Sequence, residues 1–459
     1  MTTSKFRIWA PRAKELALVV AGKARQCAAE PGGYFSAEAP ADGAEYFVRL
    51  DGRDLPDPRS RFQPHGVSGA SRQVARDFVW KDSAFRALPL SAAVIYELHL
   101  GTFTREGTLA AAAARLPELV ELGVTHVELM PLATFPGRWG WGYDGVALFA
   151  PHPTYGDPDD VKRFVASCHA YGLAVLIDVV YNHLGPDGNY LGEFGHYFTS
   201  RYQTPWGAAI NLDGAHSDEV RRFFIDNACM WIEEYHFDGL RLDAVHALCD
   251  ESALHLLQEL SSAVHALEPK LAKPLVVIAE SDQNNPRLIK PIELGGYGMD
   301  AQWSDDFHHA LHAVLTGETN GYYADFGRIE QIARAASAYR SSPRRACCAS
   351  VRRWCLSRRL CRCCFKARNG VRARHSNTSP TIRTPSSPKL CARGVALSSS
   401  SSVGIRSRCL IRKPKPPCVD HSSIGASVNV RHTASGWRST ERSLRCAATR
   451  PSYSTADAI

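Results

Sequence analysis

DPDDVKRFVASCHAYGLAVLIDVVYNH, residues 157–183, joins a helix pattern to a strand pattern, and this combination decides the fold class. The first part opens on acidic residues, which suit the positive end of a helix dipole, and continues with amphipathic spacing. The second part, LAVLIDVV, is almost continuously apolar, as parallel strands are when both faces of their sheet are covered. The polar residues that follow would lie at the carboxyl end of the strand, where barrel enzymes carry their chemistry.

The same alternation of strand and helix extends from Ala93 to residue 305. A helix is expected over 108–124 and another around residues 220–235, with a longer excursion over 184–215. This pattern argues for a parallel sheet covered on both faces, and a closed (β/α)₈ barrel needs eight strands. We therefore predict an α/β fold, an incomplete (β/α)₈ barrel over 86–340. Its six expected strands are 93–101, 125–132, 173–183, 237–243, 274–280 and 299–304.

The stretch before the barrel reads as all-β. FRIWAP, LALVVAG and EYFVRLDG are short β-rich runs, separated by Gly, Pro and Asp turns within residues 6–80. We expect residues 1–85 to form a small immunoglobulin-like β-sandwich. LPDPRSRFQPHGVSG, residues 55–69, would lead away from it as a linker.

Charge divides the chain near residue 340. Residues 1–340 carry 30 Lys or Arg and 43 Asp or Glu, a net of −13, whereas residues 341–459 carry 24 basic and 3 acidic residues, a net of +21. The overall excess of basic residues therefore belongs to the tail, and it predicts no nucleic-acid partner for the enzyme-like part. No signal peptide or membrane span is expected, and the four scattered front cysteines suit a reducing cytoplasm. Oligomeric state is left open.

Two carboxyl groups close neighbouring strands of the predicted barrel. In GLRLDAVHAL (239–248) strand periodicity puts Arg241 and Asp243 on one face, and we expect the guanidinium to depress the pKa of Asp243, as suits an anionic nucleophile. PLVVIAESD (274–282) ends its apolar strand in Glu280, whose pKa should rise and keep it a general acid. Taken alone, Arg241 and Asp243 could be a structural ion pair, and Glu280 could cap a helix. Together, two carboxyls ~5 Å apart are what retaining glycoside hydrolysis requires.

Other polar and aromatic residues admit two interpretations each. His183 could donate to a sugar hydroxyl or be a satisfied loop residue. The loop RWGWGYDG (138–145) offers Trp139, Trp141 and Tyr143, which could stack on sugar rings or pack in the core. No dedicated metal-ligand spacing such as HExxH occurs, so we expect no metal and no cofactor.

These motifs together resemble the α-amylase superfamily of glycoside hydrolases. Its conserved regions are similar to DVVYNH (178–183), GLRLDAVHAL and the strand that ends in Glu280. Within it, four stretches are most similar to the malto-oligosyltrehalose trehalohydrolase family, and the front sandwich resembles the carbohydrate-binding-like module shared with glycogen-branching enzymes. Those four stretches are residues 140–156, 181–191, 278–289 and 303–312.

The resemblance implies a function and a set of site residues. The reaction would be hydrolysis of the α-1,4 bond next to a terminal trehalose, with Asp243 as nucleophile and Glu280 as proton donor and without a cofactor. The partner would be malto-oligosyltrehalose or a related α-1,4-glucan, with no nucleic acid and no membrane. Substrate-binding residues by this likeness are Tyr143, Asp144, His183, Arg241, Leu242, Ala244, Val245, His246, Asp305, Asp306, Phe307, His308 and His309.

One departure from the superfamily affects activity. The superfamily uses a third acid, an Asp after Asn-His, and this sequence contains no Asn-His-Asp. We therefore expect the chain to be impaired. The alternatives are a glucan-branching transferase, which shares the front module and both carboxyls, and a non-catalytic glucan-binding relic.

The tail, residues 341–459, holds ten of the 14 cysteines and has no recognisable periodicity. A zinc module could use Cys361 and Cys364, with Cys418 and His421, but the other cysteines fit no regular spacing. A nucleic-acid arm could use the positive charge, although an oligosaccharide enzyme does not call for one. We favour a third hypothesis, a shifted reading frame over the missing half of the barrel, and expect the tail to be irregular and disordered.

Overall fold

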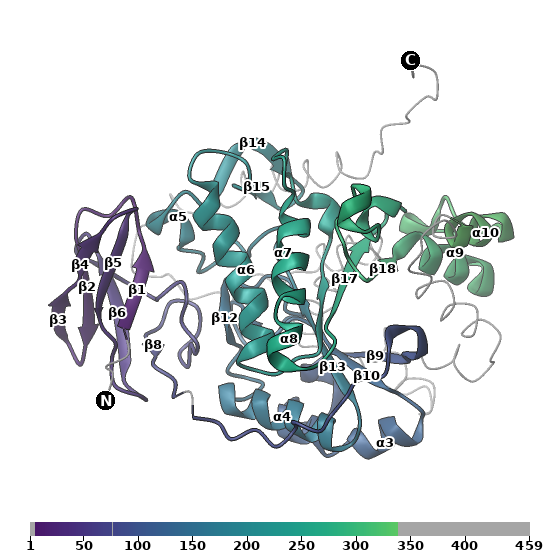
Figure 1. The fold of residues 1–459 in the computed structure, drawn as a ribbon, viewed down its shortest axis with the longest axis horizontal. Helices are drawn as coiled ribbons and strands as arrows, with labels where there is room; N and C mark the ends of the chain where they lie inside the picture. Colours follow the sequence, from purple (N-terminus) through teal and green to yellow (C-terminus); the bar gives the residue numbers. More distant parts are fainter. Residues whose placement is uncertain (1–4, 76, 338–459) are drawn as a thin grey trace, which may run out of the picture.

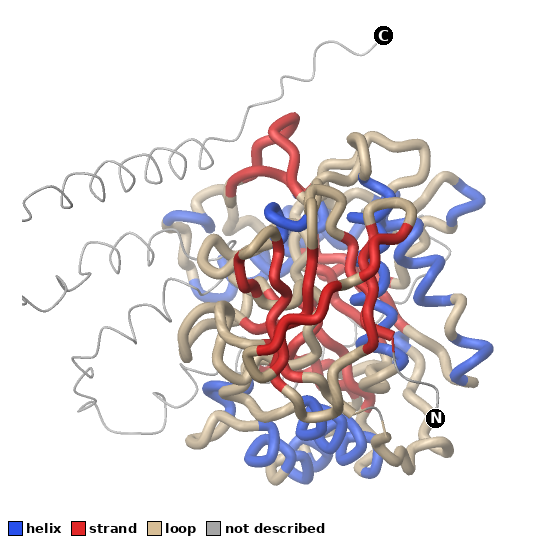
Figure 2. The backbone as a smooth tube through the Cα atoms, turned by 90° about the vertical axis from the view of Figure 1, so that its left-hand side faces the viewer, coloured by secondary structure: helices blue, strands red, loops and turns tan. Residues whose placement is uncertain are grey.

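A computed structural model of the chain describes residues 5–75 and 77–337. The predicted tail and its cysteines lie outside the described residues. Within the described part six strands form a parallel sheet. Figure 2 looks onto the side of the chain that carries the front strands, with helices below and beside them. None of the helices described is both long enough and apolar enough to cross a membrane.

Six parallel strands follow one another in chain order across the central sheet. This is the number expected from the sequence, and the arrangement is that of a (β/α)₈-type barrel. Their pairing is parallel throughout. The strands are β9 (Ile95–Leu98), β10 (His126–Leu129), β13 (Ala174–Val179), β16 (Gly239–Leu242), β17 (Val276–Ser281) and β18 (Ala301–Ser304).

The helix of the decisive stretch is α4 (Pro158–Ala170), and it begins with a capping box between Asp157 and Asp160. The helix expected over 108–124 was wrong in extent. It is divided into α2 (Leu109–Ala113) and α3 (Leu116–Glu121), because Pro117 supplies no backbone N–H and so suits only a first turn.

Longer helices cover the sheet in Figure 1, where α6 and α7 lie side by side across the strands. The buried side of α6 carries Val220, Phe223, Phe224 and Trp231. The remaining helices are α1 (Leu100–Phe103), α5 (Leu191–Phe194), α6 (Ser217–Glu233), α7 (Leu256–His265), α8 (Glu268–Leu271), α9 (Asp305–Thr316) and α10 (Ile329–Ser337).

The excursion over 184–215 contains α5 and an antiparallel hairpin that the sequence did not predict. The hairpin pairs β14 (Phe198–Thr204) with β15 (Gly207–Ile210). A second short antiparallel pair, β11 (Ala133–Thr134) with β12 (Ala147–Pro151), lies between β10 and α4 along the chain.

The register fixes which side chains share the inner face of the sheet. Asp178, Arg241 and Ile278 are paired across β13, β16 and β17, so they form one layer. Glu97 and Glu128 are paired across β9 and β10, and Glu128 is also paired with Leu176. Because Leu176 precedes Asp178 by two residues, the two glutamates lie in the layer directly below Asp178 and Arg241.

The front part is a β-sandwich, as predicted, of two antiparallel sheets. One sheet has the order β1-β5-β4, and the other has the order β3-β2-β6-β7 with β8 on β6. Phe6 and Tyr46 meet between the sheets with ring centroids 6.1 Å apart. The strands are β1 (Lys5–Trp9), β2 (Leu16–Val20), β3 (Lys23–Gln26), β4 (Ala28–Glu30), β5 (Tyr34–Glu38), β6 (Glu45–Leu50), β7 (Arg53–Leu55) and β8 (Ser71–Arg72).

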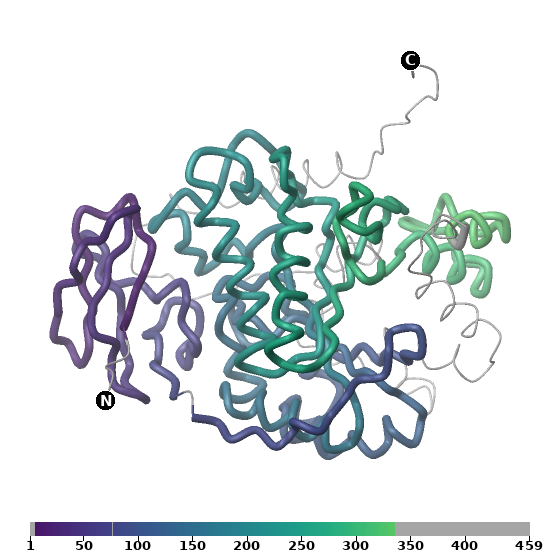
Figure 3. Tube along the Cα trace, viewed as in Figure 1, coloured from purple at the N-terminus to yellow at the C-terminus, as the bar shows by residue number. Residues whose placement is uncertain are grey.

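The stretch 55–69 does not lead away from the sandwich as a loose linker. Ser60 and Phe62 are buried, and Arg59 and Arg61 form ion pairs with α6, at 2.7 Å to Asp226 and 2.9 Å to Glu234. The tube in Figure 3 shows the chain then leaving the sandwich along the lower side of the barrel part. Side chains from this segment therefore fix the two parts against each other.

Candidate active site

A buried ion cluster lies at the carboxyl ends of β13, β16 and β17. Arg241 is its centre: Nη1 donates to both carboxylate oxygens of Asp178, at 2.8 and 2.7 Å, and to Asp243 Oδ1 at 3.0 Å. Nη2 lies 2.9 Å from Glu280 Oε1. The two predicted catalytic carboxyls thus contact different nitrogens of one guanidinium, and their side chains are 5% and 6% exposed.

Backbone and amide groups hold each carboxyl from a second side. Asn182 Nδ2 donates to Asp243 Oδ2 at 2.9 Å and to the Asp243 carbonyl at 2.8 Å. The backbone N–H of Ala244 donates to Glu280 Oε2 at 2.8 Å. Ala244 has φ 43° and ψ 50°, in the left-handed region that costs an alanine about 1–2 kcal/mol. This turn directs the backbone N–H of Ala244, the residue after Asp243, toward Glu280.

The expected direction of the Asp243 pKa was wrong. Burial, with the charge of Glu280, raises the pKa of Asp243 to about 6, although Arg241 and Asn182 act in the opposite direction. The reason is that one guanidinium is shared among three carboxyls, which a local Arg–Asp pattern does not reveal. Asp243 is still mostly anionic at pH 7, as a nucleophile must be.

Asp178 belongs to the cluster but was not among the predicted site residues. Tyr143 Oη donates to Asp178 Oδ2 at 2.9 Å, in addition to the two bonds from Arg241. Burial raises the pKa of Asp178 to about 8, and Arg241 offsets this only in part. In the sequence, Asp178 could have been recognised as a site candidate because it is the one acidic residue in an apolar strand. Asn182, next to the predicted His183, was missed as well.

His183 follows β13 along the chain, and His246 follows β16. The His183 ring is buried and stacks on Trp206 of the β14–β15 hairpin, with centroids 4.6 Å and planes 10° apart. Burial lowers the pKa of His183 to about 4, so the imidazole is neutral at pH 7. His246 is exposed and lies 3.9 Å from Asp282. Their predicted contacts with a sugar stay predictions.

The remaining predicted substrate contacts differ in exposure. Asp144 is exposed, whereas Leu242, Ala244 and Val245 are buried. Asp305 and His309, at the start of α9, are buried, and His309 packs against Tyr322. Asp306, Phe307 and His308 are half-buried, and Asp306 accepts from Asn284 at 2.5 Å. The predicted contact of this stretch with trehalose stays a prediction, with Asp306 and His308 as its more accessible members.

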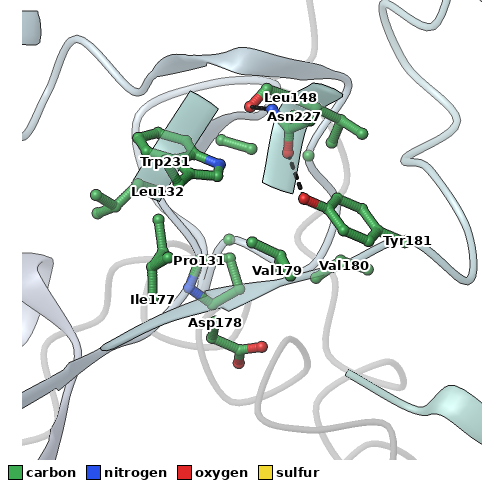
Figure 4. Close-up of a pocket in the computed structure, with 13 residues that line it drawn as sticks. Pro131, Leu132, Leu148, Ile177, Asp178, Val179, Val180, Tyr181, Asn227 and Trp231 are labelled. Carbon is green, nitrogen blue, oxygen red and sulfur yellow. Dashed lines mark hydrogen bonds between the residues drawn. The ribbon is translucent and has the colours of Figure 1, made fainter. Parts of the chain in front are cut away.

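A pocket lies on the other side of β13 from the ion cluster. Ile177, Tyr181, Asn227 and Trp231 line it, and Tyr181 Oη donates to Asn227 Oδ1 at 2.6 Å. In Figure 4 the carboxyl group of Asp178 points away from this pocket. The pocket therefore belongs to the packing between β13 and α6. Among the described residues no group of three or more His, Cys, Asp or Glu could hold a metal ion.

Comparisons with known proteins agree with this geometry. The family described as alpha amylase, catalytic domain, matches residues 67–206. The malto-oligosyltrehalose trehalohydrolase of Arthrobacter ramosus is 52% identical over 339 residues, which cover 72% of this chain and 59% of the relative. The protein of the same name from Saccharolobus solfataricus is 46% identical over 334 residues, covering 72% and 58%.

A solved structure is also similar. The crystal structure of a putative alpha amylase from Salmonella typhimurium superposes with a TM-score of 0.67 at 41% identity, covering 74% of this chain and 60% of that one. This chain thus spans about three fifths of the length of the curated relatives it matches. The strand order is that of a (β/α)₈-type barrel, residues 67–206 match the α-amylase catalytic domain, and the chain is similar to malto-oligosyltrehalose trehalohydrolases over 72% of its own length.

Proposed function

We propose that this chain carries the nucleophile and the proton donor of a retaining glycoside hydrolase that acts on malto-oligosyltrehalose. The substrate bond would be the α-1,4 bond next to the terminal trehalose, and the products would be trehalose and a shortened malto-oligosaccharide. The names and identities of the relatives support this substrate class. The two-carboxyl arrangement supports the reaction type.

The observation that carries the proposal is the contact of Asp243 and Glu280 with one guanidinium. Nη1 of Arg241 lies 3.0 Å from Asp243, and Nη2 lies 2.9 Å from Glu280. Such a bridge keeps two carboxyls of adjacent strands close together. Close carboxyls with different protonation are the requirement of the retaining mechanism.

The proposed reaction has two displacements. Asp243 attacks the anomeric carbon of the glucose next to trehalose, and Glu280 gives its proton to the glycosidic oxygen, so that trehalose leaves. Water then hydrolyses the glycosyl ester while Glu280 takes back a proton. Arg241 neutralises part of the charge on both carboxyls, and Asn182 fixes the Asp243 carboxylate through a 2.9 Å bond. We expect His183, His246 and Tyr143 to surround the sugar.

We further propose that turnover by the 459-residue chain is low. The sequence contains no Asn-His-Asp, so the third acid of the superfamily has no candidate. A reading-frame shift near residue 340 would account for the change of charge and cysteine content there. Sequencing the gene across codons 330–345 tests this. If neither other frame encodes apolar strands and an Asn-His-Asp, the frameshift hypothesis is wrong.

The substrate is tested by incubating the purified chain with maltotriosyltrehalose and measuring trehalose. Slow release that Asp243→Asn abolishes is the expected result. Ordinary rates would contradict the impairment. A change in iodine staining of amylose without trehalose release would favour a branching transferase. Binding without turnover, unaffected by Asp243→Asn in either respect, would favour a glucan-binding relic.

A further inference from the structure

A fully buried carboxyl group lies beneath the ion cluster and has no role in the reaction described above. Glu128 on β10 is 0% exposed, and neither of its carboxylate oxygens has a hydrogen-bond partner among the described residues. A buried ionised carboxylate without a partner is strongly unfavourable, because it loses its hydration and gains nothing in exchange. The protonation state of the Glu128 carboxyl therefore needs an explanation.

The surroundings of Glu128 make a negative charge still less favourable. Glu97 is its register partner on β9, and Asp178 and Glu280 are close enough on β13 and β17 to raise its pKa further, after burial, which is the largest cause. On its own strand, His126 has a pKa lowered by burial and so adds no positive charge at pH 7.

Among the described residues, the positive charge that acts on Glu128 is that of Arg241, and its guanidinium already contacts other carboxyls. Its two Nη groups contact Asp178, Asp243 and Glu280, while its buried Nε–H has no partner among the described residues. An anionic Glu128 in the layer below would compete for the same cation. A neutral Glu128 leaves the guanidinium to the three carboxyls at the strand ends.

We propose that Glu128 is a neutral, protonated carboxylic acid and a positioning residue that leaves Arg241 directed at Asp178, Asp243 and Glu280. The proposal rests on the proposed function only in calling this cluster catalytic. The protonation itself is a property of the folded chain. It is therefore tested without any measurement of turnover, so that its failure and the failure of the proposed function are distinguishable.

The first measurement is the infrared spectrum of the 459-residue chain at pH 7. Glu128→Gln removes the carboxyl but keeps a neutral side chain of the same shape. The exposed Glu118, which pairs with Arg115 on the surface, provides the control Glu118→Gln. We expect Glu128→Gln to remove the C=O stretching intensity of one protonated carboxylic acid, and Glu118→Gln to remove none. Equal spectra for the wild type and Glu128→Gln would overturn the proposal.

The second measurement is the urea midpoint of both variants between pH 4 and pH 8. An acid whose pKa is raised on folding favours the folded state below its unfolded pKa and loses that contribution as pH rises through its folded pKa. We therefore compare the folding equilibrium constant of Glu128→Gln with that of the wild type. Their ratio should be constant near pH 4 and rise at higher pH, by up to about tenfold per pH unit. Glu118→Gln should show no such rise. A lower midpoint for Glu128→Gln than for the wild type at pH 7 would mean that Glu128 is an anion stabilised by Arg241, and would overturn the proposal.

Discussion

The barrel part has a buried charge cluster at each end of its sheet, and the two clusters are built differently. At the carboxyl ends lies the upper cluster, in which the Arg241 guanidinium contacts Asp178, Asp243 and Glu280. At the amino ends lies the lower cluster, in which Asp238 and Asp82 contact three basic side chains. His169 lies 2.9 Å from Asp238 and 2.8 Å from Asp82, Lys273 lies 3.0 Å from Asp238, and His236 lies 2.9 Å from Asp82.

Their pKa values differ in direction. Burial alone would raise the pKa of Asp238, but His169 and Lys273 outweigh it and the pKa falls below its usual value. For Asp243 and Asp178, burial outweighs Arg241, and the pKa values rise to about 6 and about 8. The cluster at the amino ends therefore favours the ionised form of Asp238. The cluster at the carboxyl ends holds two buried carboxyls with different raised pKa values, as the proposed chemistry requires.

The largest expected effect comes from removing the one guanidinium of the upper cluster. Arg241→Met keeps most of the volume and leaves three buried carboxyls without their common partner. At pH 7 we expect a loss of about 3–5 kcal/mol in the free energy of unfolding, and a smaller loss at pH 5, where more of these carboxyls are protonated. Urea unfolding at both pH values measures this. A loss that is equal at the two pH values would contradict the account of the upper cluster.

Asp238 of the lower cluster should contribute to stability at neutral pH and lose that contribution only in acid. Asp238→Asn weakens the contacts with His169 and Lys273 and should cost about 2–3 kcal/mol at pH 7. Because the folded pKa of Asp238 is depressed, its contribution is present above its unfolded pKa near 3.8 and is lost as pH falls through the folded value. Thermal unfolding from pH 7 to pH 3 should therefore show the gap between variant and wild type closing. A gap between variant and wild type that is as wide at pH 3 as at pH 7 would contradict the account of Asp238.

Neutralising the nucleophile candidate should stabilise the fold. The raised pKa of Asp243 means that its contribution to stability is present below its unfolded pKa and is lost as pH rises through about 6. Asp243→Asn should thus gain about 3 kcal/mol relative to wild type between pH 4 and pH 8. Urea midpoints at these two pH values check the prediction, with Asp238→Asn as the matched buried control of opposite sign. If Asp243→Asn were destabilising at pH 8, Asp243 would be a structural ion-pair partner.

The smallest effect concerns the turn between the two catalytic candidates. Ala244→Gly removes the side chain that makes φ 43° costly, so we expect stability to change by no more than about 1 kcal/mol, toward the more stable side. Ala244→Val, with its branched side chain in the same buried turn, should be clearly less stable than wild type. Differential scanning calorimetry compares the three. Equal melting temperatures for Gly and Val would show that the turn relaxes freely.

The sequence predicted the six barrel strands because each is a short apolar run closed by polar residues, as in LAVLIDVV before Tyr181. It did not predict the hairpin over 198–210, whose alternation is interrupted by Pro205 and Gly207. It placed Arg241 beside Asp243 correctly but gave the wrong pKa direction. That direction depends on how many buried carboxyls share one guanidinium, a property of neighbouring strands that no local motif contains.

The same limit applies to Asp178 and Glu128. Each is a single acid in an apolar strand. The register of β10, β13 and β16 alone places Asp178 beside Arg241 and Glu128 in the layer below it. Conversely, the packing of residues 55–69 was hidden by a composition typical of linkers. Arg59 and Arg61 of this stretch pair with Asp226 and Glu234 of α6, which lie more than 160 residues further along the chain.

The central claim is that the upper cluster carries chemistry and the lower one stability. It is tested most directly in a chimera that joins residues 1–337 to the remaining C-terminal part of the Arthrobacter ramosus relative, by measuring trehalose release from maltotriosyltrehalose. We predict that the chimera turns over. Asp243→Asn should lower its kcat at least about a thousandfold without loss of stability, whereas Asp238→Asn should lower stability and retain most of kcat. Turnover that survives Asp243→Asn, or falls as far in Asp238→Asn, would contradict the account.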